Sequence, residues 1–209
     1  MRRMGVMGIM GNAVLALAVC LVISVAEPIP AIDATLSGAI TNDAELQGCS
    51  LGCAVDWKVE SSSSLPEQAG NRHDAIMLND WRLDTAWIES QPDYGIGEWI
   101  RFVFAEELWE KSAPTADKIR FRGFRMLNGY SKSEPVWKAN SRVKSFRLLH
   151  NNVPLFDINL RDSMEQQVIY FNDVWLRAGD VVELKITGVY PGDSYKDTAI
   201  TELMPDGAH

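Results

Sequence analysis

The chain has few of the residues that carry common catalytic and metal chemistry. It contains 3 His and 3 Cys among 209 residues. It has no His-Glu-x-x-His, no Gly-x-Ser-x-Gly, no phosphate-binding Gly-Lys-Ser/Thr and no dinucleotide-binding glycine pattern. These absences indicate a protein that is not an enzyme. A hydrolase built from carboxylates far apart in the sequence is the open alternative.

Positive charge is also scarce. Lys plus Arg number 20 against 28 Asp plus Glu, which gives a formal net charge of −8. A nucleic-acid-binding protein needs a basic surface that displaces counterions from phosphates, so nucleic acid is excluded as the expected partner. The 46% hydrophobic and 23% charged composition is that of one globular domain.

The first residues form a pattern typical of export. No charged residue lies between Arg3 and Glu27, and the apolar run ends in the small-residue sequence Ser24-Val25-Ala26. A basic start, an apolar stretch and small residues before the cleavage point predict a signal peptide over residues 1–26. We therefore expect a secreted, periplasmic or cell-envelope protein. An uncleaved membrane anchor is the alternative, and lipid attachment at Cys20 is a lesser one.

The rest of the chain is predicted as a linker over residues 27–47 and one domain over 48–209. The linker prediction rests on Pro28, Pro30 and the lack of a sustained apolar period. At the start of the domain, Cys49 and Cys53 are separated by three residues with a glycine beside each. In an oxidising compartment this even pair predicts a local disulfide, whereas zinc would require further ligands that the histidine spacing does not supply.

Alternating apolar and polar residues predict short strands. Ile100, Phe102 and Phe104 share one face and Arg101 takes the other, and Gly123 shifts this period in a way that indicates a bulge. No long helical period follows residue 26, although 105–111 could form one or two helical turns. The fold class expected is an all-β antiparallel sandwich or jelly roll. Eight segments are predicted as strands: Val55–Glu60, Glu98–Phe104, Lys118–Met126, Arg142–Leu149, Val153–Leu160, Glu165–Phe171, Val181–Val189 and Thr198–Leu203.

Oxygen-bearing residues cluster between positions 79 and 87. Closely spaced carboxylate, hydroxyl and backbone oxygens are what calcium requires. The candidate ligands are Asp80, Asp84, Thr85 and, if the last strand returns alongside, Glu202. The alternative is that both aspartates cap turns while Trp87 packs in the core.

Two predicted loops, 128–142 and 190–198, mix aromatic side chains with amide, cationic and acidic groups. Such a mixture can stack on a sugar face and bond to its hydroxyls. The alternative is a sandwich corner in which the aromatics pack inward and the charges pair with one another. The candidate ligand-binding residues are Tyr130, Lys132, Trp137, Asn140, Arg142, Tyr190, Lys196 and Asp197.

Several motifs in the same order resemble one family. They are Asp-x-x-x-Asp-Thr-Ala-Trp at 80–87, Gly-Ile-Gly-Glu-Trp-Ile at 95–100, Asn-Gly-Tyr at 128–130, Asn-Ser-Arg-Val-Lys at 140–144, Trp-Leu with Ala-Gly-Asp at 175–180 and Asp-Thr-Ala-Ile-Thr-Glu at 197–202. Over about residues 48–204 the chain is similar to the NAD glycohydrolase translocation-type glycan-binding domain. That family is a branch of the discoidin, coagulation-factor type C, galactose-binding-like sandwiches.

The resemblance implies a non-catalytic jelly roll that recognises a glycan or another cell-surface ligand through loops at one end. It does not imply NAD hydrolysis. The wider superfamily often holds a structural calcium in an Asp-Gly-Asp-x-x-Thr loop, and here Trp81 and Arg82 replace the glycine and the second aspartate. Asp80, Thr85 and Glu202 are the matching positions. An envelope protein-interaction or structural domain without a small ligand is the alternative function.

Overall fold

The computed structural model describes residues 27–46, 50–68 and 70–208. The predicted signal peptide and Cys49 lie outside these ranges, so cleavage and the Cys49–Cys53 disulfide stay predictions. Within the described ranges, no helix is both long and apolar enough to cross a bilayer.

Strands dominate the chain. In chain order, the elements are β1 (Ala31–Asp33), β2 (Thr35–Gly38), η1 (Asp43–Glu45), η2 (Leu51–Cys53), β3 (Lys58–Ser61), η3 (Ala75–Asn79), β4 (Trp87–Ile88), β5 (Trp99–Val103), α1 (Glu106–Ser112), β6 (Ile119–Asn128), α2 (Glu134–Ala139), β7 (Ser141–His150), β8 (Val153–Asn159), β9 (Gln166–Leu176), β10 (Val181–Tyr190) and β11 (Thr198–Ala208).

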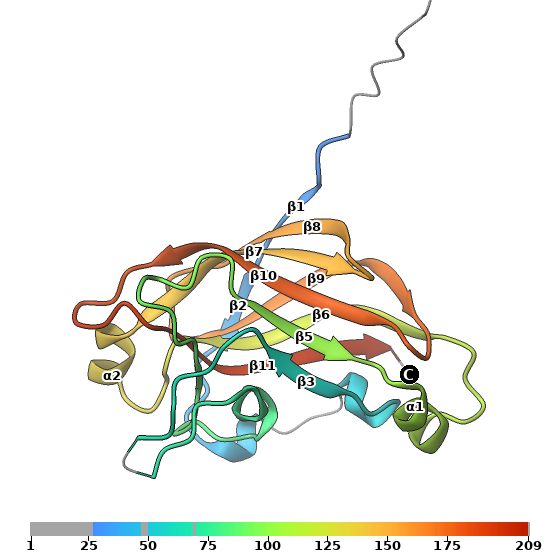
Figure 1. Cartoon of the computed structure of the whole chain (residues 1–209), viewed down its shortest axis with the longest axis horizontal. Coiled ribbons are helices and arrows are strands. Elements are labelled where there is room, and N and C mark those ends of the chain that lie inside the picture. The colour runs from blue at the N-terminus through green and yellow to red at the C-terminus, as the bar shows by residue number, and fades with distance from the viewer. Residues whose placement is uncertain (1–26, 47–49, 69, 209) are drawn as a thin grey trace, which may run out of the picture.

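The strands form two layers joined by β11 (Figure 1). One layer contains β2, β9, β6 and the second half of β11, and the other contains β8, β7, β10, β5 and β3. Strand β11 begins beside β7, in parallel at Thr198 and Ala199, and then runs antiparallel to β6 from Glu202 onward. Most other pairings are antiparallel, with β1 and β8 as a second parallel pair. The predicted β-sandwich is therefore confirmed.

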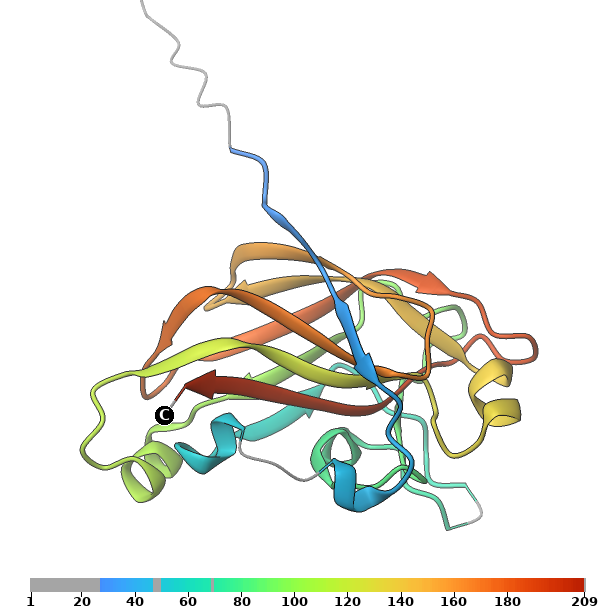
Figure 2. The ribbon, with the colours of Figure 1, turned by 180° about the vertical axis from the view of Figure 1, so that it is seen from behind.

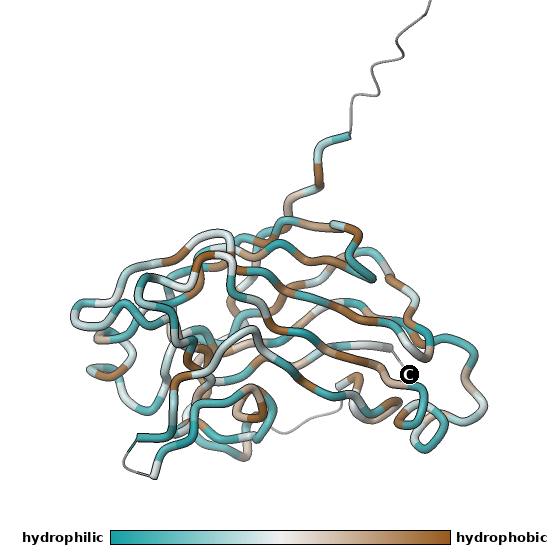
Figure 3. The backbone as a smooth tube through the Cα atoms, viewed as in Figure 1, coloured by the Kyte–Doolittle hydropathy of each residue, from teal (hydrophilic) through white to brown (hydrophobic). Residues whose placement is uncertain are grey.

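Aromatic side chains fill the space between the layers. Phe102 of β5 packs on Phe124 of β6 at 5.6 Å between ring centroids, and Phe156 of β8 stacks on Phe171 of β9 at 5.0 Å. The apolar and polar residues that alternate along the strands, seen as changing colour in Figure 3, follow this arrangement. Inward residues of β5 are fully buried, and Arg101 faces outward to pair with Glu183 at 2.7 Å.

Each of the eight predicted segments contains a strand, although in the first of them β3 begins only at Lys58, and α1 forms where one or two helical turns were expected. The bulge is also present, because the register of β6 against β9 shifts between Phe121 and Gly123. A Cβ atom at Gly123 would collide with the carbonyl oxygen of Ile169. Only glycine therefore allows the two strands to approach at this point.

The segment predicted as a linker is largely built into the sandwich. Strand β1 pairs with β8 and β2 pairs with β9, so the segment closes one edge of each layer (Figure 2). Ala34 and Leu46 are 1% and 0% exposed. Pairing with an existing edge stabilises strands too short to show an alternating pattern of their own.

We expect Gly123→Ala to destabilise the protein by at least about 2 kcal/mol, because the added methyl group forces β6 and β9 apart. Urea denaturation followed by circular dichroism measures this loss. Gly70→Ala is the matched control, since Gly70 also has positive φ, at 80°, but an added Cβ there meets no atom within 4 Å. Equal losses in the two variants would mean that the bulge does not require glycine for steric reasons.

Candidate functional site

The two loops predicted to bind a ligand meet at one end of the sandwich, beside α2 (Figure 1). The backbone N–H of Asp193 donates to the carbonyl of Lys138 at 2.9 Å, and that of Tyr195 donates to Ala139 at 2.8 Å. The parallel start of β11 on β7 fixes the bases of both loops. The structure thus brings the two loops together.

Four of the eight predicted ligand-binding residues are buried in this corner: Tyr130, Trp137, Asn140 and Arg142 are 7%, 8%, 8% and 6% exposed. Trp137 Nε1 donates to the Asn128 carbonyl at 2.7 Å, and the Arg142 guanidinium lies 4.5 Å from the Trp137 ring centroid. Arg142 also pairs with Asp162 at 2.8 Å. Tyr130 Oη donates to the Asp84 carbonyl and Asn140 Nδ2 to that of Val136. Their polar groups are thus satisfied inside the protein, as in the corner-packing alternative.

The other four predicted residues lie nearer the surface. Tyr190 Oη donates to the Leu160 carbonyl at 3.0 Å, and Asp197 is half-buried, with its backbone carbonyl accepting from Ser141. Lys132 and Lys196 are exposed. Their ammonium groups are therefore the predicted polar groups most accessible to a ligand at this end.

Two tyrosines at the same end were not among the predicted residues. Tyr195 is 57% exposed, and the ring centroid of Tyr94 lies 5.8 Å from Lys196 Nζ. Tyr195 belongs to the quoted loop, between Ser194 and Lys196, where no strand alternation buries it. That position is the signal that could have identified it. We call Lys132, Tyr195 and Lys196 the end-loop surface.

A buried carboxyl group supports the neighbouring loop, 89–98. Glu89 is fully buried and accepts the backbone N–H groups of Thr198 at 3.0 Å and Gln91 at 2.6 Å. Burial raises the pKa of Glu89 above its usual range. Gly95, with φ of 67°, leaves space for the Glu89 side chain, because a Cβ there would lie 2.6 Å from Glu89 Cγ. The buried Glu89 carboxyl therefore holds loop 89–98 in place through these hydrogen bonds.

A second buried carboxyl lies among the predicted calcium ligands. Glu202 of β11 is fully buried, and its Oε1 accepts the backbone N–H of Arg82 at 3.0 Å. Thr85 Oγ1 donates to Asp80 at 2.9 Å. Burial, followed by the nearby charge of Asp80, raises the pKa of Glu202 to about 9. A pKa of about 9 corresponds to a protonated Glu202 at neutral pH.

The donors in this cluster fit a hard cation in part. Glu202 Oε2 is buried and has no hydrogen-bond partner among the described residues, and Asp80 and Thr85 add oxygens nearby. Asp84 is turned outward, where both of its oxygens accept from the Arg82 guanidinium, at 2.9 and 2.8 Å. No group of three or more His, Cys, Asp or Glu side chains suited to a metal occurs in the described part of the chain.

We expect Trp137→Ala to lower the free energy of unfolding by about 3–5 kcal/mol, as loss of a buried Trp side chain does. Lys132→Ala, an exposed change on the same loop, should stay within about 0.5 kcal/mol of the original protein. Chemical denaturation of both variants measures the difference. If Trp137→Ala leaves stability unchanged, the corner does not depend on this ring for packing.

We expect Glu202→Gln to change the pH dependence of stability. The folded protein keeps the Glu202 proton up to a pKa of about 9, whereas the unfolded chain loses it near 4.5, the ordinary pKa of a glutamate. The unfolded state then binds fewer protons, so this group makes stability fall as pH rises through that window. The glutamine variant lacks that fall.

Urea denaturation in the presence of EDTA, at several pH values between those two limits, tests this expectation. The variant should gain stability relative to the original protein as pH increases. A constant difference across the window would show that Glu202 does not retain its proton.

The model of the NAD glycohydrolase translocation F5/8 type C domain matches residues 52–206. Among curated proteins there is no match. The solved structure of the CBM32-5 domain of GH89 from Clostridium perfringens, in complex with GalNAc-β-1,3-galactose, has a TM-score of 0.50 and 20% identity, and covers 72% of this chain and 95% of that chain.

A second similar structure holds the CBM32-1 and CBM32-2 domains of ZmpB from Clostridium perfringens. It has a TM-score of 0.56 and 12% identity over 88% of this chain, which spans 43% of the length of that one. Its complex with GalNAc gives a TM-score of 0.55 at 11% identity, with 88% of this chain and 41% of that chain covered. These likenesses show the same β-sandwich fold. The family model covers most of the sequence, and the chain belongs to the NAD glycohydrolase translocation F5/8 type C domain family.

Proposed function

We propose that this protein is an exported, non-catalytic carbohydrate-binding module that recognises a glycan on a cell surface. The observation that carries the proposal is the end-loop surface, where Tyr195 and the exposed Lys132 and Lys196 lie on loops held rigidly by the sandwich. The glycan complexes of the CBM32 structures with the same fold support this ligand class.

The chemistry of these side chains suits a sugar. An aromatic ring offers an apolar face for the C–H groups of a pyranose, and an ammonium group donates hydrogen bonds to its hydroxyls. Tyr195 supplies the ring, and Lys132 and Lys196 supply the donors. Asp197, whose side chain is half-buried beside them, would accept from a hydroxyl.

Export is part of this proposal. Removal of residues 1–26 takes Cys20 with it and leaves Cys49 and Cys53 as a pair in an oxidising compartment. Their disulfide would pin the entry to η2, which packs against β11. The protein would then act in the periplasm, in the cell envelope or outside the cell.

Calcium is the cofactor we propose for the Asp80 cluster. The ion would be held by Asp80, Thr85 and Glu202, and its positive charge would stabilise ionised Glu202 in place of the proton. Asp84 would join only after leaving Arg82. Because Trp81 and Arg82 follow Asp80 directly, binding or removal of the ion would also affect how the loop that carries them is held.

Binding of the purified protein to a broad glycan array, with calcium and again with EDTA, tests the ligand and the ion together. We expect binding to one glycan class, and a weaker signal and a lower melting temperature after chelation. If EDTA changes neither glycan binding nor the melting temperature, calcium is removed from the proposal.

A protein partner in the envelope is the second candidate. It is favoured by two large side chains on the outward face of β9, Tyr170 and Trp175, which are 59% and 44% exposed. A folded protein that binds no glycan on the array would support this candidate and overturn the first.

A further inference from the structure

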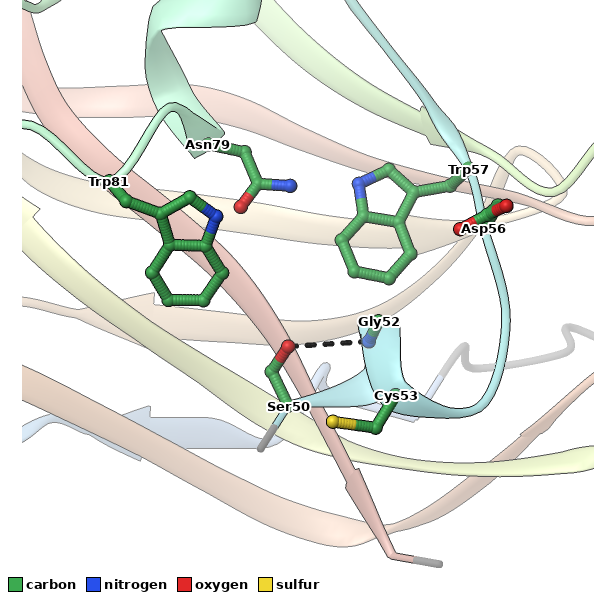
Figure 4. Close-up of a pocket in the computed structure, with 7 residues that line it drawn as sticks. All are labelled: Ser50, Gly52, Cys53, Asp56, Trp57, Asn79 and Trp81. Atoms are coloured by element: carbon green, nitrogen blue, oxygen red, sulfur yellow. Dashed lines mark hydrogen bonds between the residues drawn. The ribbon is translucent and has the colours of Figure 1, made fainter. Parts of the chain in front are cut away.

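A pocket separate from the end-loop surface lies between η2 and η3 (Figure 4). Both short helices pack against β11. The pocket has a volume of about 320 Å³. Figure 4 shows the indole rings of Trp57 and Trp81 on either side of it, with Asn79 between them. We call it the indole pocket, and it is lined by Ser50, Gly52, Cys53, Asp56, Trp57, Asn79 and Trp81.

The two tryptophans differ from those of the core. Trp87, Trp109 and Trp137 are buried, and each donates its Nε1–H to a backbone carbonyl, at 3.0, 2.8 and 2.7 Å. Trp57 and Trp81 are half-buried, and neither indole nitrogen donates a hydrogen bond within the described ranges. A buried indole N–H ordinarily has a partner, as those of the three core tryptophans do. These donors are thus available to a ligand.

The wall formed by Trp57 is rigid. Its ring packs against Phe102 and Phe104 with centroids 6.3 and 6.1 Å apart. A Cβ atom at Gly52 would lie 3.2 Å from the Trp57 ring, so the ring also lies close over η2. A ring fixed from behind loses little conformational freedom when a ligand stacks on it.

Trp81 is held at the pocket in an unusual backbone conformation. Its φ is 63°, in the left-handed region that a bulky residue rarely adopts. The buried carboxyl of Glu202 accepts the backbone N–H of the next residue, Arg82, at 3.0 Å. This bond to a carboxyl inside the core helps to keep the loop in place, and the indole lies at the surface pocket. A strained backbone conformation persists only where the surrounding structure enforces it. Such conformations are common at binding sites.

Charge and size define the ligand. Among the described residues that line the indole pocket, Asp56 is acidic and none is basic, so an anionic ligand would meet no compensating charge from them. The Asn79 amide and the two indole N–H groups can bond to hydroxyls. The volume is at the small end of the range for small-molecule sites. Resting on the proposed carbohydrate-binding function, we infer that the indole pocket binds one neutral terminal sugar residue, held against the indoles of Trp57 and Trp81.

Trp81→Gly is the decisive variant. Glycine adopts positive φ readily, so the change removes the indole and relieves the backbone strain, and the melting temperature should stay the same or rise. Affinity for the neutral glycan selected on the array should fall at least tenfold. Quenching of tryptophan fluorescence by that glycan, present in the original protein, should decrease in parallel.

A further variant serves as the control. Trp175→Ala removes an exposed indole from β9 and should leave affinity unchanged. The expected pattern is therefore loss of binding in Trp81→Gly and unchanged binding in Trp175→Ala.

The remaining outcomes separate this inference from the proposed function. If the original protein binds a glycan and Trp81→Gly binds it equally well, the indole pocket is not the site, while the carbohydrate-binding function stands. Binding restricted to sialylated or sulfated glycans would also overturn the inference. A folded protein that binds no glycan would overturn both.

Discussion

The pairing of β11 with both layers is the constraint on which the rest of the structure depends. Its first residues lie beside β7, and from Glu202 onward it pairs with β6. Because the strand passes from one layer to the other, consecutive residues on both of its faces are covered, and Thr198 to Pro205 are all buried. A carboxyl group can therefore sit in the core at Glu202 and reach the loop around Trp81. The same strand fixes the loop that carries Lys196 at its beginning and supports η2 and η3 along its length.

Both candidate binding surfaces follow from this arrangement, but they differ physically. The end-loop surface is built from exposed side chains on loops whose buried parts, such as Trp137 and Arg142, hold the corner together. The indole pocket is concave, and one wall is part of the aromatic core. A concave site with a preordered wall can hold a small ligand with fewer contacts, because less freedom is lost on binding. An exposed surface that carries lysines instead gains from a ligand that extends across several loops.

The sequence was informative wherever burial alternated along a strand. The alternation around Ile100, Phe102 and Phe104 predicted β5, and the displaced period at Gly123 predicted the bulge. Strands β1 and β2 carry no such pattern, since their stability comes from edges that the rest of the fold provides. Site residues were harder to predict, because core packing and sugar stacking use the same aromatic residue types. Composition could therefore not distinguish buried Trp137 from half-buried Trp81. The indole pocket joins segments whose proximity is set by β11, which no local pattern reveals.

The N-terminal segment has a mechanical consequence. Residues 31–38 pair with β8 at the edge of one layer and then with β9 at the edge of the other, and the chain before them leaves the sandwich on that side (Figures 1 and 2). The indole pocket lies farther along the chain, beside η2 and η3, across the sandwich from β1 (Figure 1). With residues 1–26 kept as an uncleaved membrane anchor, the alternative to cleavage, tension between residue 27 and a ligand in that pocket would be carried through both layers. The hydrogen bonds between β1 and β8 would carry this tension first, in shear. The force at which the attachment fails would therefore depend on this short edge strand.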